Sequence, residues 1–121
     1  MRSAIALGEE EEVVMKDGYM LVLVTCPDRD TARALVRLLV ERKLVACGQL
    51  LDIESIYTWE GKVCEEPEVL LILKSTAELF EHLQAAIVEH HPYEVPQIVQ
   101  LPITGGLPAY LGWMDELLDA G

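Results

Sequence analysis

Two short segments of this chain are apolar at every position, and they constrain its fold more than any other feature. Residues 20–24 read Met-Leu-Val-Leu-Val and residues 69–73 read Val-Leu-Leu-Ile-Leu. A strand with one face in water alternates apolar and polar side chains, whereas an unbroken run of branched side chains is typical of a strand covered on both faces. The sheet that contains these two strands therefore needs a packing partner on each side.

Helical periodicity marks the segments between and after these strands. Over residues 31–43 the apolar side chains recur every three or four positions, which predicts an amphipathic helix with Asp28 as its N-cap. Residues 75–78, Ser-Thr-Ala-Glu, match a capping box and predict the start of a second helix, which Pro92 ends. Residues 110–118 predict a short final helix.

A long hairpin separates the two main helices. Residues 44–59 and 63–74 are rich in strand-forming side chains, and Gly61 lies in the turn between them. Pro67 lies inside the second arm, where it removes a ladder donor, so we expect a bulge or an unpaired edge there. A last strand over residues 98–101 completes the order strand, helix, hairpin, helix, strand and helical tail.

This order predicts one α+β domain, a ferredoxin-like βαββαβ sandwich with a long central hairpin and a short C-terminal helix. The chain has 121 residues, which is enough for one such domain. We assign the domain to residues 19–121. We assign residues 1–18, which include an acidic quartet at 9–12, to a flexible leader.

Both main helices of such a sandwich pack on one face of the sheet, which leaves the other apolar face bare. A large bare apolar face is unfavourable in water, and another copy of the chain is the simplest cover. Bulky aromatic side chains also lie on elements with little local core, namely Tyr57, Trp59 and Trp113. We expect them, together with Tyr93, at contacts between subunits.

The charge balance excludes several classes of partner. The chain has 9 Lys and Arg against 21 Asp and Glu, a net charge of −12. So acidic a chain is unsuited to nucleic acid or to an anionic membrane surface, and it favours a cationic partner or a metal ion. The strand predicted over residues 69–73 also lacks the aromatic side chains with which sheets of this topology bind RNA.

The sequence also predicts a cytoplasmic location. No apolar run reaches the roughly 18 residues of a membrane-spanning helix, and the first eight residues are too weakly apolar for a secretion signal. The three cysteines, Cys26, Cys47 and Cys64, have neither the number nor the spacing of a disulfide framework or a zinc knuckle. We expect Cys47 to lie in the core.

The candidate functional site is the pair His90-His91 before Pro92. Two adjacent imidazoles beside a proline at a helix end are suitable ligands for copper or zinc. Cys26, at the end of the first strand and before a helix start, is a candidate third ligand. The alternative is structural: His90 packs on the inner helical stripe, His91 interacts with the last carbonyls of the helix, and Cys26 is a small buried side chain.

A catalytic site has less support in the residues. Cys26 as a nucleophile with a histidine base would need an orienting group, and no family signature surrounds this cysteine. The chain also lacks a glycine-rich phosphate-binding loop. We therefore expect a binding protein and not an enzyme.

Four motifs, in this order, resemble the CutA family of divalent-cation tolerance proteins. They are Ser-Ile-Tyr-Thr-Trp-Glu-Gly-Lys at 55–62, Glu-Val-Leu-Leu-Ile-Leu-Lys at 68–74, His-Pro-Tyr-Glu-Val-Pro at 91–96 and Tyr-Leu-Gly-Trp at 110–113. The resemblance covers roughly residues 19–118. It implies a ferredoxin-like homotrimer, similar in architecture to the PII signalling proteins, that is cytoplasmic and is linked to tolerance of heavy metals, copper above all.

The resemblance also implies a set of ligands. Members proposed to bind copper use a cysteine on the first strand and the two histidines before Pro-Tyr, which His90 and His91 match directly. The position of the family cysteine falls on Val24, and Cys26 lies two residues later on the same face of the strand. An alternative function within this architecture is a PII-like module that holds a small ligand or a partner protein in the cleft between subunits.

One further departure from the family lies in the first arm of the hairpin. Residues 51–54 read Leu-Asp-Ile-Glu where the family usually has a Pro-Gly step. The segment is one residue shorter, which predicts a straightened arm without a bulge.

Overall fold

The computed structural model describes residues 18–118, and the predicted leader lies outside these residues except for Gly18. Its helices and strands follow the predicted order. They are β1 (Tyr19–Cys26), α1 (Arg29–Glu41), β2 (Cys47–Trp59), β3 (Lys62–Thr76), a 3-10 turn (Ala77–Leu79), α2 (Phe80–His90), β4 (Ile98–Pro102) and α3 (Pro108–Leu118).

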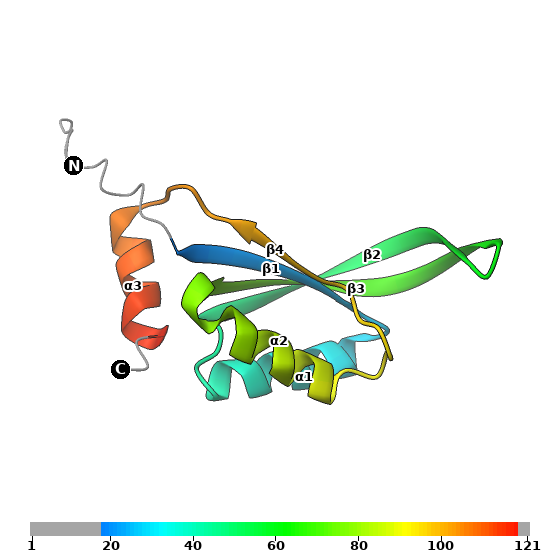
Figure 1. Cartoon of the computed structure of the whole chain (residues 1–121), viewed down its shortest axis with the longest axis horizontal. Helices are drawn as coiled ribbons and strands as arrows, with labels where there is room; N and C mark the ends of the chain where they lie inside the picture. Colours follow the sequence, from blue (N-terminus) through cyan, green and yellow to red (C-terminus); the bar gives the residue numbers. More distant parts are fainter. Residues whose placement is uncertain (1–17, 119–121) are drawn as a thin grey trace.

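The four strands form one antiparallel sheet in the order β2-β3-β1-β4, which confirms the predicted α+β ferredoxin-like topology. Figure 1 shows α1 and α2 side by side on one face of this sheet. The helix α3 stands at one end of the sheet, and the β2–β3 hairpin extends far beyond the opposite end (Figure 1). The long hairpin and the final helix are therefore present as predicted.

The start of α1 confirms the predicted cap. Asp28 is extended, and its carboxylate accepts a hydrogen bond of 2.8 Å from the backbone N–H of Thr31. This bond satisfies one of the backbone donors that the first helical turn leaves without a partner, and it lowers the pKa of Asp28. The cap places α1 immediately after Cys26, so the end of β1 and the start of α1 lie together.

The capping box predicted at residues 75–78 is wrong. Ser75 is fully buried in β3, and its hydroxyl donates to the carbonyl oxygen of Leu44 at 2.7 Å instead of capping a helix. The helix α2 begins only at Phe80, and no side chain caps it. Ser75 therefore belongs to a strand and not to a helix cap, because the pairing of β3 with β1 continues through Thr76.

The hairpin is paired without interruption. Its register runs from Trp59 opposite Lys62 to Cys47 opposite Lys74, and Pro67 lies opposite Glu54 within it. Of the two alternatives expected at Pro67, a bulge or an unpaired edge, the structure has the unpaired edge: β1 pairs with β3 only as far as Val69, so the outer edge of β3 has no strand beside it at Pro67. The straight first arm is confirmed.

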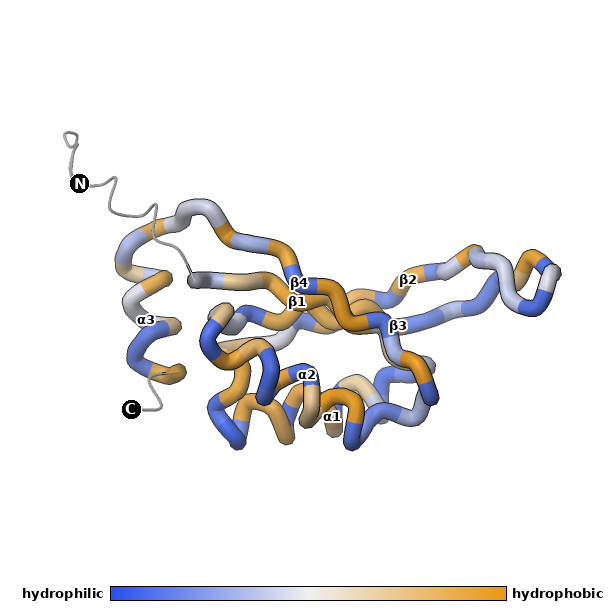
Figure 2. The backbone as a smooth tube through the Cα atoms, viewed as in Figure 1, coloured by the Kyte–Doolittle hydropathy of each residue, from blue (hydrophilic) through white to orange (hydrophobic). Residues whose placement is uncertain are grey.

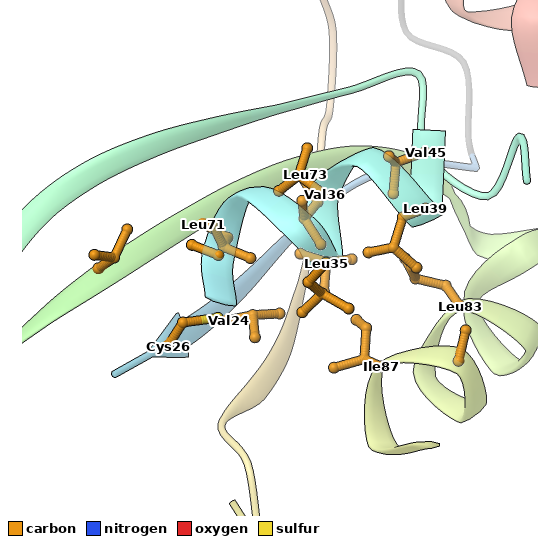
Figure 3. Packing of buried hydrophobic residues seen from close by; sticks show 14 residues of the cluster. Val24, Cys26, Leu35, Val36, Leu39, Val45, Leu71, Leu73, Leu83 and Ile87 are labelled. Atoms are coloured by element: carbon orange, nitrogen blue, oxygen red, sulfur yellow. The ribbon is translucent and has the colours of Figure 1, made fainter. Parts of the chain in front are cut away.

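One face of the sheet carries the core. Alternate residues of β1 and β3 point towards the helices and are fully buried, among them Val22, Val24 and Leu71. Figure 3 shows Leu35, Val36 and Leu39 of α1 between these strands and the side chains Leu83 and Ile87 of α2. Burial of this contiguous apolar cluster holds the two helices on the sheet.

The opposite face is apolar and uncovered, as the sequence predicts. Leu23 lies on it between its partners Ile72 and Val99, and Leu51 extends it onto β2. Val99 is 47% exposed and Leu51 is 53% exposed. Figure 2 shows the apolar centre of the strands and the polar arm of β3 in the hairpin. We call this side of the sheet the open face.

The helix α3 covers the end of the sheet, including the end of the open face, where Tyr110 contacts Cys47 and Lys74, and it leaves the centre of the open face uncovered. Leu111, Met114 and Leu118 are buried in a second small cluster with Tyr19 and Ala46. This cluster fixes α3 beside the start of β1, where Figure 1 places it. Of the helices in residues 18–118, none combines the length and hydropathy that a membrane crossing requires.

Candidate functional site

The fold brings Cys26 and His91 together. Cys26 is the last residue of β1, and His91 is the first residue after α2, in the connector (residues 91–97) that leads to β4. The Cys26 Sγ lies 3.9 Å from the His91 Nε2. Sequence alone could not predict this contact, because the two residues belong to the sheet layer and the helix layer and are 65 positions apart.

Both ring nitrogens of His91 have partners in the backbone. The backbone N–H of Tyr93 donates to His91 Nδ1 at 3.0 Å, so Nδ1 carries the lone pair in the neutral ring. This bond assigns the proton to Nε2, which donates to the carbonyl oxygen of Thr25 at 2.8 Å. His91 is 8% exposed, and its ring packs against the ring of Tyr93 with the centroids 4.9 Å apart. His91 thus joins the connector to the end of β1.

Cys26 is a neutral thiol in this environment. Burial raises its pKa to about 11, and the negative charges of Asp28 and Glu68 act in the same direction. A metal ion binds the thiolate and not the thiol, so coordination by Cys26 requires the loss of a proton that the site retains at neutral pH.

His90 is arranged differently. It is exposed at the last position of α2, and its Nδ1 donates to the carbonyl oxygen of Ala86 at 3.0 Å. Because Nδ1 carries the proton, Nε2 carries the lone pair that a metal ion would use. His90 lines one wall of a groove of about 450 Å³ between α1 and α2, where Glu89 and His91 are neighbours and Thr31 and Leu38 form the other wall.

The structural alternative for the histidines is wrong in its details. His90 does not pack on the inner stripe of α2, and the buried imidazole is that of His91, which bonds to β1 and not to the last carbonyls of its own helix. The alternative for Cys26 agrees with its burial.

The three candidate ligands do not form one metal-binding group in this arrangement. Within residues 18–118, no three His, Cys, Asp or Glu side chains are grouped so that they could hold a metal ion. Cys26 and His91 face each other with their polar atoms already engaged, and His90, whose Nε2 carries the lone pair, lines the groove. The residues therefore fit a metal ion only if His91 exchanges a backbone partner for it.

The aromatic side chains expected at subunit contacts lie on the surface of the single chain. Tyr57, Trp59 and Trp113 are 39%, 64% and 40% exposed. Tyr57 donates to Glu66 at 2.8 Å, and this bond is the main cause that raises the pKa of Tyr57 to about 12. Tyr93 donates to Glu68 at 2.7 Å, and burial first and then this bond raise the pKa of Tyr93. Both phenols therefore remain hydrogen-bond donors at neutral pH.

A polar cluster on the open face was missed by the sequence reasoning, which expected Cys47 in the core. Cys47 is half-buried on the open face opposite Lys74, and its Sγ lies 3.9 Å from Lys74 Nζ and 3.7 Å from the hydroxyl of Tyr110. The feature of the sequence that predicts the position of Cys47 opposite Lys74 is the register of the hairpin. With the turn at Glu60 and Gly61, unbroken pairing places residue 47 opposite residue 74.

Comparison with known proteins identifies the family. A family model described as CutA1 divalent ion tolerance protein matches residues 20–117. The divalent-cation tolerance protein CutA of Thermus thermophilus is 42% identical over 97 residues, which are 79% of this chain and 94% of that protein. The chloroplastic protein CutA of Arabidopsis thaliana is 40% identical over 113 residues, which are 93% of this chain; this chain spans 60% of that longer protein.

Solved structures agree with the sequence matches. CutA from Synechococcus elongatus superposes with a TM-score of 0.85 at 30% identity and covers 87% of this chain and 94% of its own. The structure of the periplasmic divalent cation tolerance protein CutA from Archaeoglobus fulgidus has a TM-score of 0.81 at 32% identity. It covers 83% of this chain and 98% of its own. From its fold, its motifs and these matches, the chain belongs to the CutA1 family of divalent ion tolerance proteins.

Proposed function

We propose that this chain acts in metal tolerance by binding divalent metal ions, copper among them, as a cytoplasmic homotrimer with an architecture similar to that of the PII proteins. Its role is binding and not catalysis. The names of its relatives support the tolerance function, and the net charge of −12 favours a cationic ligand. The cytoplasm is part of the proposal, since relatives are named for the chloroplast and for the periplasm.

The open face supports self-association. Exposed apolar side chains, Leu51 on β2 and Val99 on β4 among them, lie beside the half-buried Leu23 and Ile72, so the apolar face extends across all four strands. Removing apolar surface from water contributes roughly 25 cal/mol per Å², so a continuous face of this kind favours a partner with the same surface. Three copies that turn these faces inward would cover them, and the protruding hairpins could then reach neighbouring subunits.

The single observation that carries the metal proposal is the position of the His90 lone pair. The bond from Nδ1 to the Ala86 carbonyl oxygen assigns the lone pair to Nε2, the ligand atom, and His90 lines the groove together with Glu89. We assign the first contact with the metal ion to His90. Cys26 and His91, which already face each other, would join if the thiol lost its proton and the His91 Nε2 proton moved to Nδ1, which would break the bonds to Thr25 and Tyr93 and free Nε2 for the ion.

The experiment is a calorimetric titration of the assembled protein with Cu(II). The variants are His90→Ala, His91→Ala and the double variant, and His82→Ala is the control because His82 is also an exposed histidine on α2. We expect the wild type and His82→Ala to bind equally and the double variant to lose the site. Equal copper affinity in the wild type and the double variant would remove the proposed site. Stabilisation by a metabolite but by no metal ion would favour the PII-like alternative instead.

A further inference from the structure

The polar cluster on the open face contains a thiol and an amine in direct contact. Cys47 and Lys74 are cross-strand partners on β2 and β3, with Sγ 3.9 Å from Nζ. The Lys74 amine also donates to Gln49 Oε1 at 3.2 Å and to the Tyr110 hydroxyl at 3.3 Å. It lies 5.5 Å from the centre of the Tyr110 ring. The hydroxyl of Tyr110, on α3, contacts the Cys47 sulfur as well.

The other two cysteines lack this arrangement among the described contacts. Cys26 is fully buried on the core face, and its sulfur contacts the His91 ring. Cys64 is half-buried like Cys47, but the recorded contact of its sulfur is the carbonyl oxygen of Lys62. Cys47 therefore combines partial exposure in the single chain, at the end of the open face beside α3, with a neighbouring amine, and neither the metal proposal nor the core uses its sulfur.

We propose that Cys47 and Lys74 form a reversible covalent crosslink when the protein meets a peroxide. In the first step the Cys47 thiol and hydrogen peroxide give the sulfenic acid and water, so sulfur is oxidised and the peroxide oxygen is reduced. In the second step the neutral Lys74 amine attacks this sulfur. An S–N bond forms, the S–O bond breaks, and the hydroxyl leaves with an amine proton as water. The proton that the lysine ammonium loses beforehand goes to solvent.

The geometry allows the second step without a change of the backbone. Directly opposed residues of an antiparallel pair have Cβ atoms about 4.5–5.5 Å apart, and the long lysine side chain can reach its neighbour by rotation of its own bonds. The crosslink withdraws the Lys74 nitrogen from Gln49 and from Tyr110. The crosslink thus removes the hydrogen bond between Lys74 and α3 and leaves the buried contacts of Leu111 and Met114 in place.

The test is intact-mass spectrometry after treatment with hydrogen peroxide in a Cys64→Ser background, where Cys47 is the one remaining thiol that is not buried within its own chain. We expect a product lighter by two hydrogen atoms, insensitive to dimedone and returned to the starting mass by a thiol reductant. Fragment mapping should join the peptides that contain Cys47 and Lys74. The variant Cys47→Ser should give none of this product.

The deciding control is Lys74→Arg, which keeps the positive charge and the donors but does not supply the amine. We expect Lys74→Arg to accumulate a dimedone-reactive sulfenic acid at Cys47 and no product that has lost two hydrogen atoms. The same mass loss in Lys74→Arg would overturn the proposal, as would a wild type that stops at the sulfenic acid. Circular dichroism identifies any variant that fails to fold. In that case the proposal is tested by fragment mapping of the protein that keeps both Cys47 and Lys74, which must join the peptides that contain these two residues.

Discussion

The Nε2 of His91 donates a hydrogen bond of 2.8 Å to the carbonyl oxygen of Thr25 and thereby ties the segment after α2 to the end of β1. The carbonyl of Thr25 is one residue before Cys26, so the same bond places the imidazole beside the buried thiol. A residue that was a candidate ligand in the sequence is therefore also a structural link between the two layers. His91 holds the two layers together and His90 does not, so the two histidines should differ in their effect on the free energy of unfolding.

Replacing His91 should destabilise the fold far more than replacing His90. His91→Ala leaves the Thr25 carbonyl and the Tyr93 N–H without side-chain partners and opens a cavity, so we expect a loss of about 2–4 kcal/mol in the free energy of unfolding. His90→Ala removes an exposed side chain and should change stability by less than about 0.5 kcal/mol. Urea unfolding followed by circular dichroism measures the free energy of unfolding of both variants. Equal losses in His91→Ala and His90→Ala would contradict the structural role of His91.

The buried thiol predicts a loss of stability in alkali. Cys26 has a pKa of about 11 in the folded chain against 9.0 in the unfolded one, so the folded state holds its proton longer. Its contribution is therefore complete below pH 9.0 and is lost as the pH rises to about 11, a change of about 2–3 kcal/mol. Between pH 9.0 and about 11, the free energy of unfolding should fall less steeply for Cys26→Ala than for the wild type. Both proteins contain the same tyrosines, so the ionisation of tyrosine is common to the two profiles. Parallel profiles would count against a neutral, buried Cys26.

Much of the fold could be predicted because it depends on local patterns. The two apolar runs, the 31–43 periodicity and the turn at Gly61 each specify an element without knowledge of the rest. The start of α2 could not be predicted, because Ser75 suits a helix cap and a buried strand end equally well. Only the pairing of β3 with β1 and the Leu44 carbonyl select the strand.

The site was predictable in its residues but not in its geometry. The sequence indicates His90, His91 and Cys26 by their chemistry, whereas the ring nitrogen that carries each proton depends on backbone partners such as the Tyr93 N–H. The apolar neighbours of Cys47 in the sequence predict a place in the core. Its true place on the open face follows from a register that one extra or missing residue would reverse.

The contact between α1 and β2 depends on the absence of a side chain at Gly48. A Cβ there would lie 2.8 Å from Val36 Cγ1 and 2.9 Å from Leu73 Cδ2, and the branched Val36 side chain has little freedom to move. Gly48→Ala should therefore cost about 1–3 kcal/mol. Gly112→Ala, in α3 with nothing within 4 Å of the new methyl group, should gain about 0.5–1 kcal/mol. Thermal unfolding of the two variants compares them, and a stabilised Gly48→Ala would refute this packing.

A charge on the open face should disrupt the proposed trimer. Val99 and Val88 are similarly exposed, at 47% and 50%, but Val99 lies on the open face and Val88 lies on α2. We expect Val99→Glu to dissociate the oligomer at micromolar concentration and Val88→Glu to leave it intact, because only the former buries a carboxylate in an apolar contact. Size-exclusion chromatography with light scattering reports the masses. Dissociation by both variants, or by neither, would place the contact elsewhere.

Sedimentation equilibrium of the wild-type chain at micromolar dilution tests the proposed trimer most directly, because the uncovered apolar face is the reason for this assembly. We expect a single species with the mass of three chains. A stable and well-folded single chain under these conditions would contradict it.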